Sequence, residues 1–138
     1  MGAAQMSALK AGLVYFLSVF AVGFMLGTIR VLLIEPHLGA LGAVLLETPF
    51  ILAASWLFCR CWIGRFNVPS ALVSRLGMGA IAFALLIAAE ILLGLYGFGR
   101  SLADQIAAWR SPPGALGLAG QILFGLFPLV QGLTEKIR

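Results

Sequence analysis

The chain has 138 residues, of which 62% are hydrophobic and only 10% are charged, compared with about 25% charged residues in an ordinary soluble domain. This composition excludes a soluble globular domain and predicts a single membrane-embedded domain. Nine Lys and Arg against five Asp and Glu give a net charge of +4. We assign this charge to topology and to contact with membrane lipids, and expect no nucleic-acid partner, because no basic helix with interleaved aromatic residues is present.

Four apolar segments are long enough to cross a bilayer, which takes about 20 residues per crossing. Proline residues lie in the gaps between these segments, where they start or stop helices. The sequence therefore predicts an all-α integral membrane protein, a bundle of four transmembrane helices in a single domain covering residues 1–138. The spans are expected at about 12–34, 40–63, 76–97 and 114–132.

The segment SLADQIAAW follows the third span. It places Leu102, Ile106 and Trp109 on one helical face, with most polar residues elsewhere on the wheel. This spacing predicts a short interfacial helix at about 101–110, lying on the membrane between the third and fourth spans. An ordinary polar loop is the alternative.

Basic residues are distributed unevenly between the two sides of such a bundle. Four crossings place both termini and the second loop on one side. Because cytoplasmic loops are enriched in Lys and Arg, we expect both termini in the cytoplasm. The terminal side holds Lys10, Arg60, Arg65, Arg75, Lys136 and Arg138, and the other side holds Arg100, Arg110 and, if it is not embedded, Arg30.

Each predicted span contains a polar residue that is unfavourable in lipid. At 1.5 Å per residue, Glu47, Glu90 and Gln121 are expected roughly 10 Å below the outer boundary of the membrane. Arg30, with its long side chain, is expected roughly 6 Å below it. A charge facing lipid costs at least about 2.5 kcal/mol at a helix centre. All four side chains are therefore predicted to face the interior of the bundle.

Small residues share helical faces with these polar residues, and small residues in membrane helices indicate close helix contacts. We therefore predict a packing role for four glycines. They are Gly23 and Gly27 with Arg30, Gly94 with Glu90, and Gly117 with Gln121.

Arg30, Glu47, Glu90 and Gln121 are thus candidates for one buried cluster that binds a ligand or a proton. Two carboxylates against one guanidinium leave excess negative charge if both are ionised. A low dielectric then favours a shared proton, a bound cation or a cationic ligand. The alternative is structural: Arg30 and Glu47 pair to fix helix register while Glu90 is protonated and hydrogen-bonded.

Other sequence features give no chemistry. Cys59 and Cys61 lie about 200° apart on a helix and make a poor chelate, and His37 is expected roughly 33 Å from them, at the opposite end of the span. No nucleotide-binding, hydrolase or metalloprotease motif is present. We expect no metal and no cofactor, and we assign no catalytic residue.

The stretch GTIRVLLIEPHLGALGAVLLETPFILAASW, from Gly27 to Trp56, resembles a segment of small uncharacterised four-helix proteins of bacterial inner membranes. The resemblance implies the location in a bacterial inner membrane and no particular activity.

Three classes of function remain open. The first is proton-linked binding or transport of a small molecule or ion, in a homo-oligomer or a larger membrane complex. The second is an accessory or assembly subunit of a larger membrane complex. The third is an integral membrane enzyme that uses Glu47 and Glu90 as acid and base on a lipid-soluble substrate. A cavity that reaches Glu47 favours the first, a sealed cluster the second, and an opening toward lipid the third.

Overall fold

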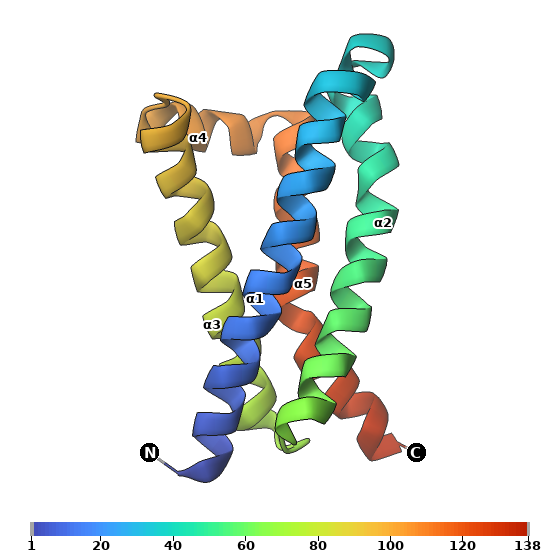
Figure 1. Ribbon diagram of the computed structural model, residues 1–138, viewed down its shortest axis with the longest axis vertical. Helices are drawn as coiled ribbons and strands as arrows, with labels where there is room; N and C mark the ends of the chain where they lie inside the picture. Colours follow the sequence, from blue (N-terminus) through green and yellow to red (C-terminus); the bar gives the residue numbers. More distant parts are fainter. Residues whose placement is uncertain (1, 138) are drawn as a thin grey trace.

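The computed structural model describes residues 2–137, and the side chains of residues 2–135. The described residues are helical, with short connections and no strand (Figure 1). The elements in chain order are α1 (Ala3–Ile29), the π-helical segment η1 (Arg30–Ile34), α2 (Glu35–Phe66), α3 (Leu72–Leu92), the π-helical segment η2 (Leu93–Gly97), α4 (Leu102–Arg110) and α5 (Pro112–Ile137).

Three continuous helical runs in the described chain are long and apolar enough to cross a membrane: Ala3–Phe66, Leu72–Gly97 and Pro112–Glu135. The first run contains 64 residues, which is far more than one crossing needs. It bends back on itself at Gly39, whose φ of 77° lies in the left-handed region open to glycine. In Figure 1, α1 and α2 therefore lie side by side and run in opposite directions.

The long helices α1, α2, α5 and α3 form a closed ring in which each contacts its two neighbours. Figure 1 shows these four helices along the long axis of the molecule and α4 lying across one end. Both termini lie at the opposite end, which we call the terminal end. The end that carries α4 is called the α4 end.

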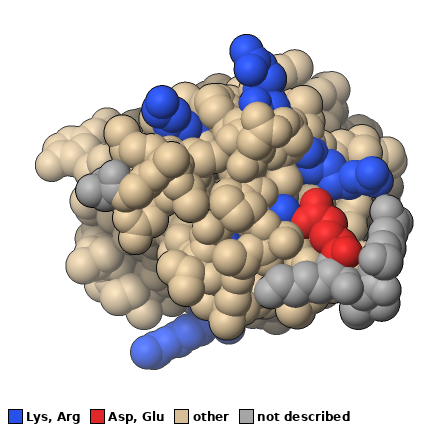
Figure 2. All heavy atoms as spheres, turned by 90° about the horizontal axis from the view of Figure 1, so that it is seen from below, with Lys and Arg blue, Asp and Glu red and all other residues tan. Residues whose placement is uncertain are grey.

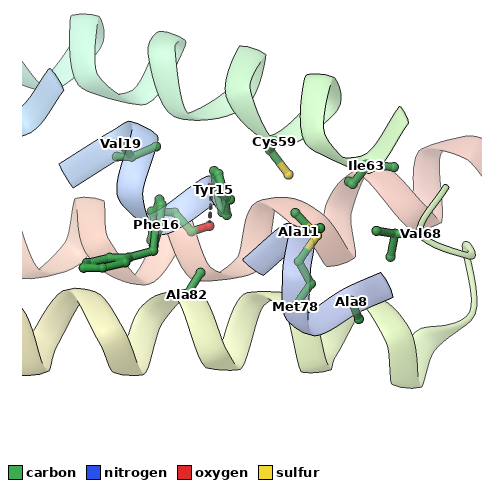
Figure 3. Close-up of a cluster of buried hydrophobic side chains, with 11 residues drawn as sticks. Ala8, Ala11, Tyr15, Phe16, Val19, Cys59, Ile63, Val68, Met78 and Ala82 are labelled. Atoms are coloured by element: carbon green, nitrogen blue, oxygen red, sulfur yellow. Dashed lines mark hydrogen bonds between the residues drawn. The ribbon is translucent and has the colours of Figure 1, made fainter. Parts of the chain in front are cut away.

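The hydrophobic core fills the half of the ring near the terminal end (Figure 3). Its fully buried side chains include Ala11, Tyr15, Cys59 and Met78. Here α3 and α5 approach so closely that a Cβ atom on Gly79 would collide with the backbone carbonyl of Gly125. Small residues thus allow the backbone contact that packs this half of the bundle.

One proline in the core is compensated by a side chain. Pro128 lies inside α5 and has no N–H, so the carbonyl of Phe124 lacks its helical donor. The hydroxyl of Tyr15 in α1 donates to that carbonyl at 2.7 Å, and the two aromatic rings stack with centroids 4.3 Å apart. A hydrogen bond between helices therefore replaces the missing bond within α5 (Figure 3).

The predicted all-helical fold is confirmed, although the spans differ at their ends. The connection expected between the first two spans is itself helical, because Pro36 stands in the first turn of α2, where a missing N–H costs nothing. The helix expected at 101–110 is present as α4, with Ser101 as its N-cap. The true end of α2 is set by Asn67, which adopts the left-handed conformation typical of a helix C-cap.

Candidate functional site

A cavity of about 750 Å³ occupies the half of the ring nearer the α4 end. Its volume lies within the range of about 300–1,000 Å³ that is typical of small-molecule sites. All four predicted polar residues line it: Arg30, Glu47, Glu90 and Gln121. Its walls are otherwise largely apolar and come from every long helix and from both π-helical segments.

Arg30 and Glu47 form the first pair of the site. Arg30 Nε lies 2.5 Å from Glu47 Oε2, and Arg30 Nη1 lies 3.8 Å from Glu35 Oε2. The Nε–H bond of Arg30 does not point at Glu47 Oε2, so this contact is an ion pair by distance and not a hydrogen bond. The side chains of Arg30 and Glu47 are 27% and 16% exposed, which means that this pair borders the cavity and is not sealed in the core.

Glu90 and Gln121 form the second pair. Gln121 Nε2 donates to Glu90 Oε2 at 2.5 Å, and Gln105 Nε2 lies 3.5 Å from Glu90 Oε1. The other amide atom of Gln121, Oε1, is buried and has no partner among the described residues. The structure thus brings the four predicted residues around one cavity, but as two pairs. Glu47 pairs with Arg30, and Glu90 accepts from Gln121.

Helix α4 positions Gln105, which the sequence analysis left on the polar face of this helix. The Asp104 N–H donates to Ser101 Oγ and the Ser101 N–H donates to Asp104 Oδ2, both at 3.1 Å. These reciprocal bonds cap the helix. The Ser101 backbone N–H and then its hydroxyl lower the pKa of Asp104, with a further contribution from Arg100. The capped helix places Gln105, which is 4% exposed, against Gly94 and Glu90.

Arg100 is a second cation of the cavity that the sequence analysis assigned to a loop. It lines the cavity at its edge and lies 5.6 Å from the centroid of the Phe98 ring. Among the described side chains it makes no ion pair. The expectation of two carboxylates against a single arginine is therefore wrong, because the cavity lining holds two of each. In the sequence, Arg100 directly follows Gly99, three residues after the end of η2 at Gly97.

Both π-helical segments adjoin site residues. Arg30 is the first residue of η1, and η2 begins three residues after Glu90. A π-turn widens a helix and rotates the residues that follow it, and such turns occur frequently at functional sites. At the level of the cavity, the residues that follow α1 and α3 are therefore rotated about the helix axis compared with a regular α-helix.

The four predicted packing glycines divide into two kinds. A Cβ on Gly23 would lie 3.7 Å from Ile51 of α2, and a Cβ on Gly94 would lie 3.1 Å from Gln105 of α4, so both are packing positions. At Gly117 and Gly27, no atom of another helix lies within 4 Å of the Cβ position. Gly117 is exposed with open space at its Cβ, and the nearest group to Gly27 is the Arg30 guanidinium. Both line the cavity, where a missing side chain leaves room.

A different arginine, Arg75, is the most deeply buried charge in the described chain, at 1% exposure. It donates to the carbonyls of Val68, Pro69 and Pro128 and pairs with Glu135. The sequence predicts a basic residue of the second loop at this position. Its contacts instead join this loop to α5 and close the terminal end of the bundle.

The two cysteines differ in exposure. Cys59 is buried in the core and Cys61 is exposed. Within residues 2–137 no group of three or more metal-ligating side chains comes together. Searches of protein-family models, of curated proteins and of solved structures gave no match to the chain. The function must therefore be argued from the site itself.

Proposed function

We propose that the protein is a small multi-pass membrane protein that binds a ligand in the cavity at the α4 end. The observation that carries this proposal is the convergence of one polar residue from each predicted span, including Glu90 and Gln121, on a single cavity. Burying polar side chains within a membrane is costly, so their meeting around a cavity favours a ligand site.

The proposal includes four crossings, by α1, α2, α3 and α5, with α4 lying along the membrane surface. Exposed apolar side chains cover the length of these helices, as lipid contact requires. At the terminal end, Lys10, Arg60 and Arg65 are exposed, and Figure 2 shows this end with Lys and Arg around its edge. This distribution favours a cytoplasmic terminal end, with the cavity in the outer leaflet of a bacterial inner membrane.

Binding is proposed to be linked to protons. A proton and a cationic ligand compete for the same carboxylate, so a ligand cation at Glu90 is expected to be released as that group is protonated. Transport across the membrane would further require the terminal end to open. In this structure that end is closed by the core around Tyr15 and by the contacts of Arg75.

The exposure of the site favours binding over an accessory role, and the separate partners of its two carboxylates favour binding over catalysis, even though apolar residues of the cavity wall are exposed toward lipid. An accessory role needs only a sealed cluster, whereas Glu47 is 16% exposed at a cavity wall. Acid–base catalysis by two carboxylates needs both to face the same substrate atoms. Glu47 is held by Arg30, and Glu90 is held by Gln121.

The proposal is tested by filling the cavity. Gly120 lines it and has open space at its Cβ, while its neighbour Ala119 is exposed and outside the lining. The two residues lie at the same depth on different faces of α5. Protein with Gly120→Leu is compared with protein carrying Ala119→Leu, which adds similar volume outside the cavity. Bound molecules are detected by native mass spectrometry of protein released from its own membranes.

We expect a molecule to remain bound to the wild-type and Ala119→Leu proteins and to be lost from the Gly120→Leu protein. Both variants must keep the thermal stability of the wild type for the comparison to hold, and Gly117→Leu provides a second filling variant at the cavity wall. Equal retention by the filled and unfilled proteins would refute a ligand site in this cavity.

A further inference from the structure

Glu90 and Gln121 place a carboxylate and a free amide oxygen next to each other at the cavity wall. The carboxylate of Glu90 accepts bonds from two amides and makes no ion pair with any described side chain. Beside it, Gln121 Oε1 is buried without a partner. A negative charge next to an unsatisfied acceptor fits a ligand that supplies both positive charge and several N–H donors.

A primary ammonium group meets both needs, because it carries three N–H donors and one positive charge. A bare metal cation fits less well, since Ca²⁺ and Mg²⁺ take about six or more oxygen ligands. The aromatic rings of Phe20, Phe24 and Phe124 also line the cavity, and such rings attract an organic cation through their faces.

The edge of the cavity carries a positive charge, Arg100, and apolar residues along which a hydrocarbon chain can leave the cavity. Arg100 makes no ion pair with a described carboxylate, its charge acting on Asp104 of α4 only at longer range. The Arg100 side chain passes over Gly94. Gly94 lies one helical turn, about 5.4 Å, beyond Glu90, so an anionic group on the ligand can meet Arg100 while its ammonium group meets Glu90. Phe24, Val31, Leu32 and Phe98 also line the cavity and are 52%, 52%, 67% and 64% exposed.

The helices on either side of this edge separate toward the α4 end. In Figure 1, α1 and α3 pack together near the terminal end and diverge as they approach α4. Exposed apolar residues on both sides of the edge suit a hydrocarbon chain that continues into the surrounding lipid.

We infer that the ligand is a zwitterionic amphiphile, with its primary ammonium group bound by Glu90 and Gln121, its phosphate or carboxylate at Arg100, and its hydrocarbon chain passing between α1 and α3. The inference rests on the proposed ligand cavity and names the chemical class of its occupant. An aminophospholipid of the outer leaflet has this chemistry.

The test places the purified protein in nanodiscs with equal parts of phosphatidylethanolamine, phosphatidylcholine and phosphatidylglycerol. Lipids that stay bound after release are identified by native mass spectrometry. These headgroups carry a primary ammonium, a trimethylammonium without N–H donors, and no cation. We expect the ethanolamine lipid to be retained roughly tenfold or more over the other two, as the loss of one charged hydrogen bond implies.

Glu90→Gln keeps the shape of the side chain and is expected to remove this preference. Glu135→Gln is the matched control, because Glu135 is a carboxylate outside the cavity lining whose ion-pair partner is Arg75, and it is expected to leave the preference unchanged. Soluble O-phosphoethanolamine, which lacks the chains, is expected to bind far more weakly than the lipid. Equal binding of the soluble compound would refute an amphiphile.

The outcomes separate this inference from the proposed function. If a lipid with a different headgroup is retained and Gly120→Leu removes it, the cavity is supported as a ligand site and the ammonium ligand is refuted. An ethanolamine preference that survives Glu90→Gln would refute the assigned role of Glu90. If Gly120→Leu changes the binding of no lipid and of no soluble molecule, the cavity is refuted as a ligand site.

Discussion

The Tyr15 hydroxyl donates to the carbonyl of Phe124, which the ring of Pro128 deprives of its helical donor. This bond joins α1 to α5 across the ring of helices, whose direct contacts otherwise run between neighbours. It lies directly below the cavity, because Phe124 belongs both to the core and to the cavity lining. The contact therefore supports the floor of the candidate site.

Removing this hydroxyl is expected to destabilise the bundle. Tyr15→Phe leaves the buried Phe124 carbonyl without a donor, at a cost of about 1–3 kcal/mol. Pro128→Ala restores an N–H to α5, so Tyr15→Phe is expected to cost less in that background. Thermal unfolding in detergent measures both effects, with Tyr96→Phe as a control at a position that is 85% exposed. Equal losses in the two backgrounds would show that Tyr15 does not substitute for the missing helical bond.

The sequence predicted the helices well because lipid demands long apolar runs, and these are visible without any knowledge of packing. The regular rise of a helix predicts a similar depth for Arg30, Glu47, Glu90 and Gln121, and all four line one cavity. Depth alone does not predict which of these side chains pair, because pairing depends on how each helix is rotated about its axis. The π-helical segments η1 and η2 change that rotation next to Arg30 and Glu90, and nothing in the local sequence marks them.

The residues that the sequence analysis missed were polar groups assigned to loops and surfaces. Gln105 reaches Glu90 because α4 folds across the end of the bundle, and Arg100, just before α4, lines the cavity. Arg75 is buried because the connection between α2 and α3 presents carbonyls that a guanidinium can reach. Such contacts join segments that are distant in the chain, so no periodicity within one helix predicts them.

Arg30 and Glu47 are expected to be energetically coupled. Arg30→Met leaves a carboxylate without its partner at the cavity wall, and Glu47→Gln in the same protein removes that unpaired charge. Unfolding of the two single variants and the double variant is expected to give a coupling free energy of roughly 0.5–3 kcal/mol. Arg100→Met serves as the control cation, for which no coupling to Glu47 is expected. Additive losses for Arg30→Met and Glu47→Gln would mean that the ion pair contributes nothing to stability.

The capping box of α4 is expected to make part of the stability depend on pH. The folded pKa of Asp104 lies below its ordinary value because of the Ser101 hydrogen bonds. Its stabilising contribution is therefore present above the ordinary pKa of an aspartate and is lost as the pH falls through the lowered folded value. The difference in melting temperature between the wild type and Asp104→Asn should be present at neutral pH and shrink in acid. A difference that stays constant with pH would exclude this role for the carboxylate.

The central claim is that the polar residues face a cavity open to the outer side of the membrane. It is tested most directly by the labelling of a cysteine at Gly120, which lines that cavity, in a protein whose exposed Cys61 is changed to Ser. Ala119→Cys, at the same depth on the exposed face of α5, is the control. We predict that a small, charged, membrane-impermeant thiol reagent labels the cysteine at position 120 from the outer side only and leaves that at position 119 unlabelled. Labelling of position 120 from the cytoplasmic side alone, or from neither side, would contradict the account.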